Sequence, residues 1–167
     1  ISEILNFRGG GMAIHGGLLG GVLAGYIYTK VKKLNFFKMA DCVVLGIPLA
    51  QAIGRWGNYS NKEAHGGPTD LPWGIMVDGV VHPTFLYESI WDLGVFIFLM
   101  LFRKKQKYEG QILVYYITLY SIGRFFIEGL RTDSLMLGPL RMAQVISLGF
   151  ILIGVILNYV LSKKNKR

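Results

Sequence analysis

A four-residue repeat of polar side chains marks one predicted helix. Tyr116, Tyr120, Arg124 and Glu128 recur every four residues in the segment that starts at Gln111. Residues at this spacing share one helix face. An arginine guanidinium stays protonated and donates paired hydrogen bonds to phosphate oxygens, and a nearby carboxylate fixes its orientation. The face therefore predicts an anion-binding site that suits a phosphate group.

Other apolar segments carry ionisable side chains at the same depth. A helix rises about 1.5 Å per residue. His15 therefore lies in the first turn of one segment, Arg55 in the last turn of a second and Glu88 in the second turn of a third. Ionisable groups in membrane spans are costly and usually face the bundle interior or a wet cavity. Together with Arg124 and Glu128 they predict one functional site shared by four helices.

The elements that would hold this layer are about five apolar segments, each close to the roughly 20 residues that span a bilayer. They are Met12–Thr29, Met39–Trp56, Thr84–Phe102, Gln111–Glu128 and Met142–Leu161. The sequence is 52% hydrophobic and only 17% charged, whereas soluble domains carry about a quarter charged residues. We therefore predict an all-α integral membrane protein, with residues 1–167 as a single transmembrane domain.

The basic residues predict the orientation of these segments. Most of the 18 Lys and Arg residues lie on one side, in three clusters. These are Lys30, Lys32, Lys33 and Lys38; Arg103, Lys104, Lys105 and Lys107; and Lys163, Lys164, Lys166 and Arg167. By the positive-inside rule this side and the C-terminus are cytoplasmic, and the ionisable layer lies toward the outer leaflet. The clusters explain the net charge of +8 through attraction to anionic lipids, without a nucleic-acid partner.

Residues 57–83 form a long extracytoplasmic loop in this arrangement, and long connections in compact domains are usually functional. Within the loop, Asp78 and Gly79 separate two short apolar runs, which predicts a small β-hairpin on the outer face. Cys42 lies near the cytoplasmic end of its helix, and we expect it to be a small buried hydrophobe. No Cys or His cluster has metal-ligand spacing, so we expect no metal and no organic cofactor.

Each site residue has a simpler explanation when taken alone. Arg55 and Arg124 lie near helix ends, where long basic side chains snorkel to the headgroups. Glu128 would then be only their counter-ion, and His15 a hydrogen-bonded structural histidine. A membrane transporter or lipid flippase with an outer-leaflet anionic-lipid site is the alternative function, although transport sites usually lie near the midplane between internal repeats. A non-catalytic lipid-binding scaffold is a third alternative, but it would not explain why His15 and Glu128 are present.

Four polar segments together resemble a known family. They are His15–Gly21, Gly54–Gly66, His82–Glu88 and Gly123–Asp133, and in this order they resemble the motifs of prolipoprotein diacylglyceryl transferases. The resemblance implies an enzyme of the bacterial cytoplasmic (inner) membrane. It would transfer a diacylglyceryl group from phosphatidylglycerol to the lipobox cysteine thiol of prolipoproteins and release glycerol phosphate.

The resemblance also implies residue roles and partners. The family's catalytic residues map onto His15, Arg55, Arg124 and Glu128, and its phosphatidylglycerol-binding residues onto Arg55, Asn58, Glu63, Gly66, Tyr120 and Arg124. The implied partners are phosphatidylglycerol, prolipoprotein signal peptides and membrane lipids. Family members have about seven spans, two of them before the helix that begins with the His-Gly-Gly motif. The chain is therefore expected to lack the N-terminal part of the family.

Overall fold

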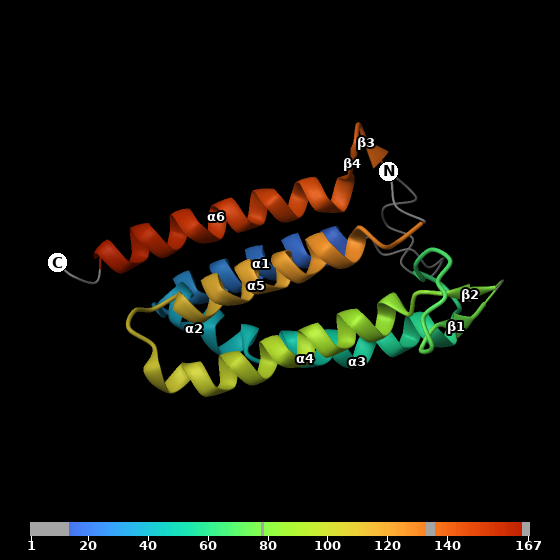
Figure 1. The fold of residues 1–167 in the computed structure, drawn as a ribbon. Helices are drawn as coiled ribbons and strands as arrows, with labels where there is room; N and C mark the ends of the chain where they lie inside the picture. The colour runs from blue at the N-terminus through green and yellow to red at the C-terminus, as the bar shows by residue number, and fades with distance from the viewer. Residues whose placement is uncertain (1–13, 78, 133–135, 165–167) are drawn as a thin grey trace, which may run out of the picture. The chain divides into compact units, whose positions relative to one another are not determined.

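The computed structural model describes residues 14–77, 79–132 and 136–164. Most of these residues are helical (Figure 1). By its internal contacts the chain divides into two units, Ile1–Met39 and Ala40–Arg167. The organisation of the whole chain as one transmembrane domain stays a prediction.

The first unit contains α1, Ile14–Val31, in the region of the first predicted segment. After α1 the chain turns through Lys33, whose φ is 55°. The side-chain oxygen of Asn35 then accepts a hydrogen bond of 2.9 Å from the amide of Phe37. This bond satisfies one of the free donors at the start of the next helix, which is the usual role of an N-cap asparagine.

The predicted continuous helix Met39–Trp56 is wrong, because this region forms two helices. They are α2, Phe36–Val44, and α3, Ile47–Ser60, and they meet at an angle of 41°. Pro48 lies in the first turn of α3. Proline has no amide hydrogen and its ring clashes with the carbonyl four residues earlier, so α2 cannot continue unbroken into α3.

The helix also continues beyond Arg55, which we expected to be in its last turn. Residues as far as Ser60 keep the helical pattern, and the amide of Asn61 still donates to the carbonyl of Gly57 at 2.9 Å. The chain leaves the helix only where Lys62 and Ala64 adopt φ values of 53° and 57°. The polar residues after Arg55 therefore extend the helix by about one turn, since they retain its backbone hydrogen bonds.

The remaining long helices agree closely with the predicted ranges. They are α4, Thr84–Phe102, α5, Gln111–Glu128, and α6, Met142–Lys164, with a short 3₁₀ turn, Arg103–Lys105, after α4. In the described part of the chain, Thr84–Lys105 and Met142–Lys163 are long and apolar enough to cross a membrane. The bent pair α2–α3 adds a third if it counts as one span. Membrane character is thus confirmed, and the count of five spans stays a prediction.

Two short strand pairs lie next to helix ends. Strands β1, Ile75–Met76, and β2, Val80–Val81, pair antiparallel within the predicted extracytoplasmic loop, on either side of the turn that contains Gly79. Strands β3, Met136–Leu137, and β4, Leu140–Arg141, pair in the same way before α6. The sequence did not predict this second pair.

Asp41 on α2 joins that helix to the start of α5. The carboxylate is 5% exposed. Its Oδ2 accepts from the amide of Gly110 at 2.6 Å, and its Oδ1 accepts from the amide of Leu113 at 2.9 Å. A negative charge is favourable there because it meets the free amides and the positive end of the helix dipole. Since Asp41 and Val44 take the buried face of α2, Cys42 is exposed, and its predicted burial is wrong.

Close contacts then fix α5 between α4 and α6. Trp91 on α4 donates its indole N–H to the carbonyl of Leu119 at 2.9 Å. A Cβ on Gly123 would lie 2.6 Å from Cε2 of Trp91, so only glycine allows this approach. Arg141, the last residue of β4, donates from Nη1 to the carbonyl of Glu128 at 2.7 Å. The same carbonyl also accepts from the amide of Arg131 at 3.2 Å, so two donors hold the last turn of α5.

Gly123→Ala should therefore destabilise the protein by about 1–3 kcal/mol, the usual cost of overpacking a well-packed site. The expected observation is a lower thermal unfolding temperature in detergent. Gly94→Ala on α4 is the matched control, because nothing lies within 4 Å of its added Cβ. Equal unfolding temperatures for the two variants would contradict the tight contact between Trp91 and Gly123.

Candidate functional site

One carboxylate joins two arginines from different helices. Glu88 lies in the second turn of α4, Arg55 near the end of α3 and Arg124 in the last half of α5. Oε2 of Glu88 lies 2.8 Å from Nε of Arg55, and its Oε1 accepts from Nη1 of Arg124. The Glu88 side chain is only 6% exposed. Glu88 therefore links α3, α4 and α5 through charge-assisted hydrogen bonds.

A second carboxylate completes the network from within α5. Nη2 of Arg124 lies 2.8 Å from Oε2 of Glu128, as expected for residues four apart on a helix. The Glu128 side chain is 4% exposed, while those of Arg55 and Arg124 are 19% and 20% exposed. The two carboxylates are thus buried behind the guanidinium groups. They balance the two positive charges, which makes burial of all four groups tolerable.

The tyrosine part of the predicted α5 face also contacts α3. Nη2 of Arg55 donates to the hydroxyl of Tyr120 at 3.5 Å, and the rings of Tyr116 and Tyr120 stack with centroids 5.9 Å apart. Tyr116 in turn donates to Oε1 of Gln51 at 3.1 Å. The predicted face of α5 is therefore one continuous polar surface packed against α3 and α4. Figure 1 shows α3 alongside α4, and α4 also packs against α5.

Asn58 lies near the end of α3, and Glu63 lies in the turn that follows. The Glu63 side chain is exposed, and its Oε1 accepts from Nδ2 of Asn61 at 3.2 Å. In the part of the chain that the structure describes, it makes no ion pair with Arg55 or Arg124. The structure therefore does not bring Glu63 to the arginines. The carbonyl of Asn58 accepts from the amide of Glu63 at 3.0 Å, which holds the turn.

Gly66 has a positional role in the loop. Its amide donates to the carbonyl of His82 at 2.9 Å, and it is buried. A Cβ on Gly66 would lie 2.6 Å from Cβ of His82 and 3.0 Å from the carbonyl oxygen of Leu130. Glycine is needed because the loop backbone passes directly between the start of α4 and the end of α5.

His15 lies in the first turn of α1, in the other unit of the chain. Its side chain is outside the described part of the structure. Its proposed part in the site therefore stays a prediction.

Sequence reasoning missed which carboxylate joins the arginines. It placed Glu88 in the same layer but named only Glu128 as a counter-ion of the arginines, and it assigned Glu63 to phosphatidylglycerol binding. It also missed Gln51 and Asp92, which lie one helical turn from Arg55 and Glu88 respectively. The available signal was their spacing of four residues, which puts each pair on one face.

The charged side chains surround a very small cavity. Arg55, Glu88, Asp92, Tyr120 and Arg124 line about 10 Å³, together with apolar parts of neighbouring residues. This volume is about the minimum that holds one water molecule. In the described ranges no group of three or more His, Cys, Asp or Glu side chains could hold a metal ion. The donors around the cavity are guanidinium and hydroxyl groups, which suit an anion.

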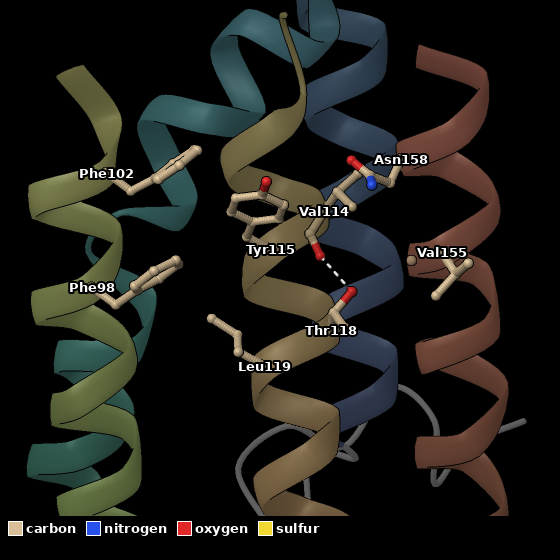
Figure 2. A pocket seen from close by; sticks show the side chains of 9 residues that line it. Phe98, Phe102, Val114, Tyr115, Thr118, Leu119, Val155 and Asn158 are labelled. Atoms are coloured by element: carbon tan, nitrogen blue, oxygen red, sulfur yellow. Dashed lines mark hydrogen bonds between the residues drawn. The ribbon is translucent and has the colours of Figure 1, made fainter. Parts of the chain in front are cut away.

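A larger hollow of about 380 Å³ lies elsewhere, between α5 and its neighbours α4 and α6 (Figure 2). Its lining is mainly apolar, with Phe98, Phe102 and Val155 among the contacts. Thr118 donates to the carbonyl of Val114 at 2.9 Å within its own helix, so its hydroxyl is already satisfied. The lining contains no Asp, Glu, Lys, Arg or His. The smaller, charged cavity is therefore the candidate site.

The fold and the cavity define a class of protein. Long apolar helices surround a neutral network of two arginines and two carboxylates near their ends, which is the arrangement of a membrane protein with ionisable groups inside its bundle. The family model described as prolipoprotein diacylglyceryl transferase matches residues 1–160. The chain belongs to this family of transferases.

Relatives from bacteria support the same assignment. The chain is 77% identical over 167 residues to the phosphatidylglycerol–prolipoprotein diacylglyceryl transferase of Clostridioides difficile, which covers 99% of this chain and 67% of the relative. It is 54% identical over 176 residues to the protein of the same name in Clostridium novyi, covering 99% of this chain and 68% of the relative. It is 52% identical over 167 residues to the protein of the same name in Bacillus cytotoxicus, and the match covers 92% of this chain and 62% of the relative. The chain thus spans about two thirds of these relatives.

Glu88→Gln should destabilise the protein by about 2–3 kcal/mol, because it leaves two neighbouring arginines without their shared countercharge. The arginines keep some contact with solvent, so we expect less than the full cost of breaking a buried pair. Thermal unfolding in detergent would measure the change. Glu63→Gln is the control and should change stability by less than about 0.5 kcal/mol, since Glu63 is exposed. Equal effects of the two substitutions would contradict the role of Glu88.

Proposed function

We propose that the protein containing this chain transfers the diacylglyceryl group of phosphatidylglycerol to the cysteine thiol of a prolipoprotein signal peptide, with release of glycerol phosphate. The observation that carries this proposal is the link from Arg55 through Glu88 to Arg124 among apolar helices. The names of the relatives support the same reaction.

The site is proposed to face the outer leaflet of the bacterial cytoplasmic membrane, with the C-terminus in the cytoplasm. The charged network lies near the ends of α3 and α5 and the start of α4, whereas the basic turn Arg103–Lys105 follows the opposite end of α4. Basic residues favour the cytoplasmic side. Phosphatidylglycerol would then enter sideways from the surrounding lipid and place its phosphate at the arginines.

Within the residues that the structure describes, both arginines retain donors for this phosphate. A guanidinium has five N–H groups. Arg55 uses Nε for Glu88 and Nη2 for Tyr120, and Arg124 uses its Nη atoms for the two carboxylates. Glu88 and Glu128 would fix the guanidinium planes, and the remaining N–H groups would hold the phosphate oxygens.

Residues at the rim of the site complete the proposed binding of phosphatidylglycerol. Asn58 and Tyr120 would add hydrogen bonds to the headgroup. Gly66 would bring the loop backbone close, because it has no side chain. Glu63 would act at the exposed rim and not through the arginines, since its carboxylate contacts Asn61.

The proposed chemistry is attack by the substrate thiolate on the glycerol C3 carbon. A new S–C3 bond forms while the C3–O bond to phosphate breaks, and the bonding electron pair leaves on the phosphate oxygen. Arg55 and Arg124 would stabilise this growing negative charge. The thiol must first lose its proton, since the thiolate is the nucleophile. His15 is the proposed acceptor, because histidine titrates near neutral pH.

The proposal is tested with the complete protein in vesicles that contain phosphatidylglycerol and a lipobox peptide. We expect release of glycerol phosphate in step with a gain of one diacylglyceryl group in the mass of the peptide. Lipid movement across the bilayer without either product would instead favour a flippase.

Arg124→Lys should lower kcat/KM in this assay by about 100-fold or more, the usual effect of removing a donor that stabilises developing charge. Lysine keeps the charge but cannot bond Glu88 and Glu128 at once through a planar fork. Arg103→Lys is the matched control, since Arg103 is exposed at the other end of α4, and it should leave kcat/KM unchanged. Near-normal turnover by Arg124→Lys would contradict the proposed role of the guanidinium.

A further inference from the structure

Asp92 is a buried carboxyl group that the proposed chemistry does not use. It lies one turn after Glu88 on α4 and is 2% exposed. Its Oδ2 has no hydrogen-bond partner within residues 14–77, 79–132 and 136–164. A buried polar atom without a partner is costly and needs an explanation.

The surroundings of Asp92 connect it to the arginine network. Asp92 lines the small cavity together with Arg55, Glu88, Tyr120 and Arg124. In the described part of the chain it makes no ion pair, because both arginines bond to Glu88. An unpaired buried charge is unfavourable, so a carboxyl group here is retained as the neutral acid. In this form it can donate a hydrogen bond as well as accept one.

Glu88 is the acceptor to which Asp92 could donate. Residues four apart on a helix are neighbours on one face, and both side chains line the same cavity. In the structure the two oxygens of Glu88 are each occupied by an arginine. An anionic phosphate would compete for these same guanidinium groups. Each N–H group that turns to the phosphate would cost Glu88 one of its hydrogen bonds.

We propose that Asp92 is a positioning residue, which donates a hydrogen bond to Glu88 when an anionic lipid phosphate engages Arg55 and Arg124. This inference rests on the proposed function, because it requires such a lipid at the arginines. The proton stays on Asp92 throughout, and no covalent bond to carbon or phosphorus changes. Asp92 thereby keeps Glu88 in place while the substrate is bound.

Kinetics of Asp92 variants test this role in the complete protein. Asp92→Asn keeps an N–H donor and should stay within about threefold of the wild-type KM for phosphatidylglycerol. Asp92→Leu and Asp92→Ala remove the donor and should raise that KM by about 10-fold or more with little change in kcat, because the bond is made equally in the bound ground state and transition state. The control is Val95→Ala, which removes buried apolar volume on α4 and should lower stability without raising KM.

Two kinetic results would overturn the inference. Loss of kcat in a folded Asp92→Asn variant would show that Asp92 transfers a proton and does not merely donate a hydrogen bond. An unchanged KM in either donor-free variant would show that Glu88 does not need it. Asp92→Ala and Asp92→Leu differ in size, so one of them suffices if the other does not fold.

An infrared measurement separates this inference from the proposed function. The spectrum of the wild type minus that of Asp92→Asn should contain a carboxylic acid C=O band, and adding phosphatidylglycerol to the micelles should shift it. The absence of the band, or a band that phosphatidylglycerol leaves unchanged, would overturn the role of Asp92. A shifted band in a protein that releases no glycerol phosphate would support Asp92 while rejecting the transferase function.

Discussion

Glu88 imposes the main physical constraint on the second unit, because it must satisfy two arginines that come from different helices. Arg55 and Arg124 could not lie this close within apolar helices without a shared countercharge, since an unpaired buried charge is strongly unfavourable. With Glu128 the network is neutral, and its carboxylates are the most buried members. The arrangement holds the guanidinium groups in fixed directions before any anion binds, which is the condition for stabilising charge during a reaction.

The rest of the unit positions these charges. Asp41 binds the first amides of α5, and Arg141 binds a carbonyl at its end. Between these two ends of α5, Trp91 packs against Gly123 and donates to the carbonyl of Leu119, which fixes the distance between α4 and α5. The helix that carries Arg124 and Glu128 is thus held at both ends and in the middle. Small shifts of such groups reduce catalysis, so rigid placement suits the proposed reaction.

Much of this arrangement could be predicted from the sequence because it depends on regular spacing. The four-residue repeat on α5 and the apolar lengths of α4 and α5 follow directly from helix geometry. Spacing along one helix does not show which carboxylate meets which arginine on another helix, so the bridging role of Glu88 was missed. The break before Pro48 could have been predicted, since proline lacks an amide hydrogen. The continuation of α3 beyond Arg55 depends on local backbone hydrogen bonds, which composition does not reveal. The exposure of Cys42 likewise follows from the rotation of α2 that Asp41 sets.

Glu88 and the two arginines are proposed to act as one unit on the lipid phosphate. A double-mutant cycle between Arg55→Lys and Glu88→Gln, measured as kcat/KM for phosphatidylglycerol in the complete protein, tests it most directly. If the residues act as a unit, kcat/KM of the double variant should lie within about threefold of kcat/KM of the less active single variant. Losses that multiply across the two substitutions would show that the residues act independently and would contradict this account.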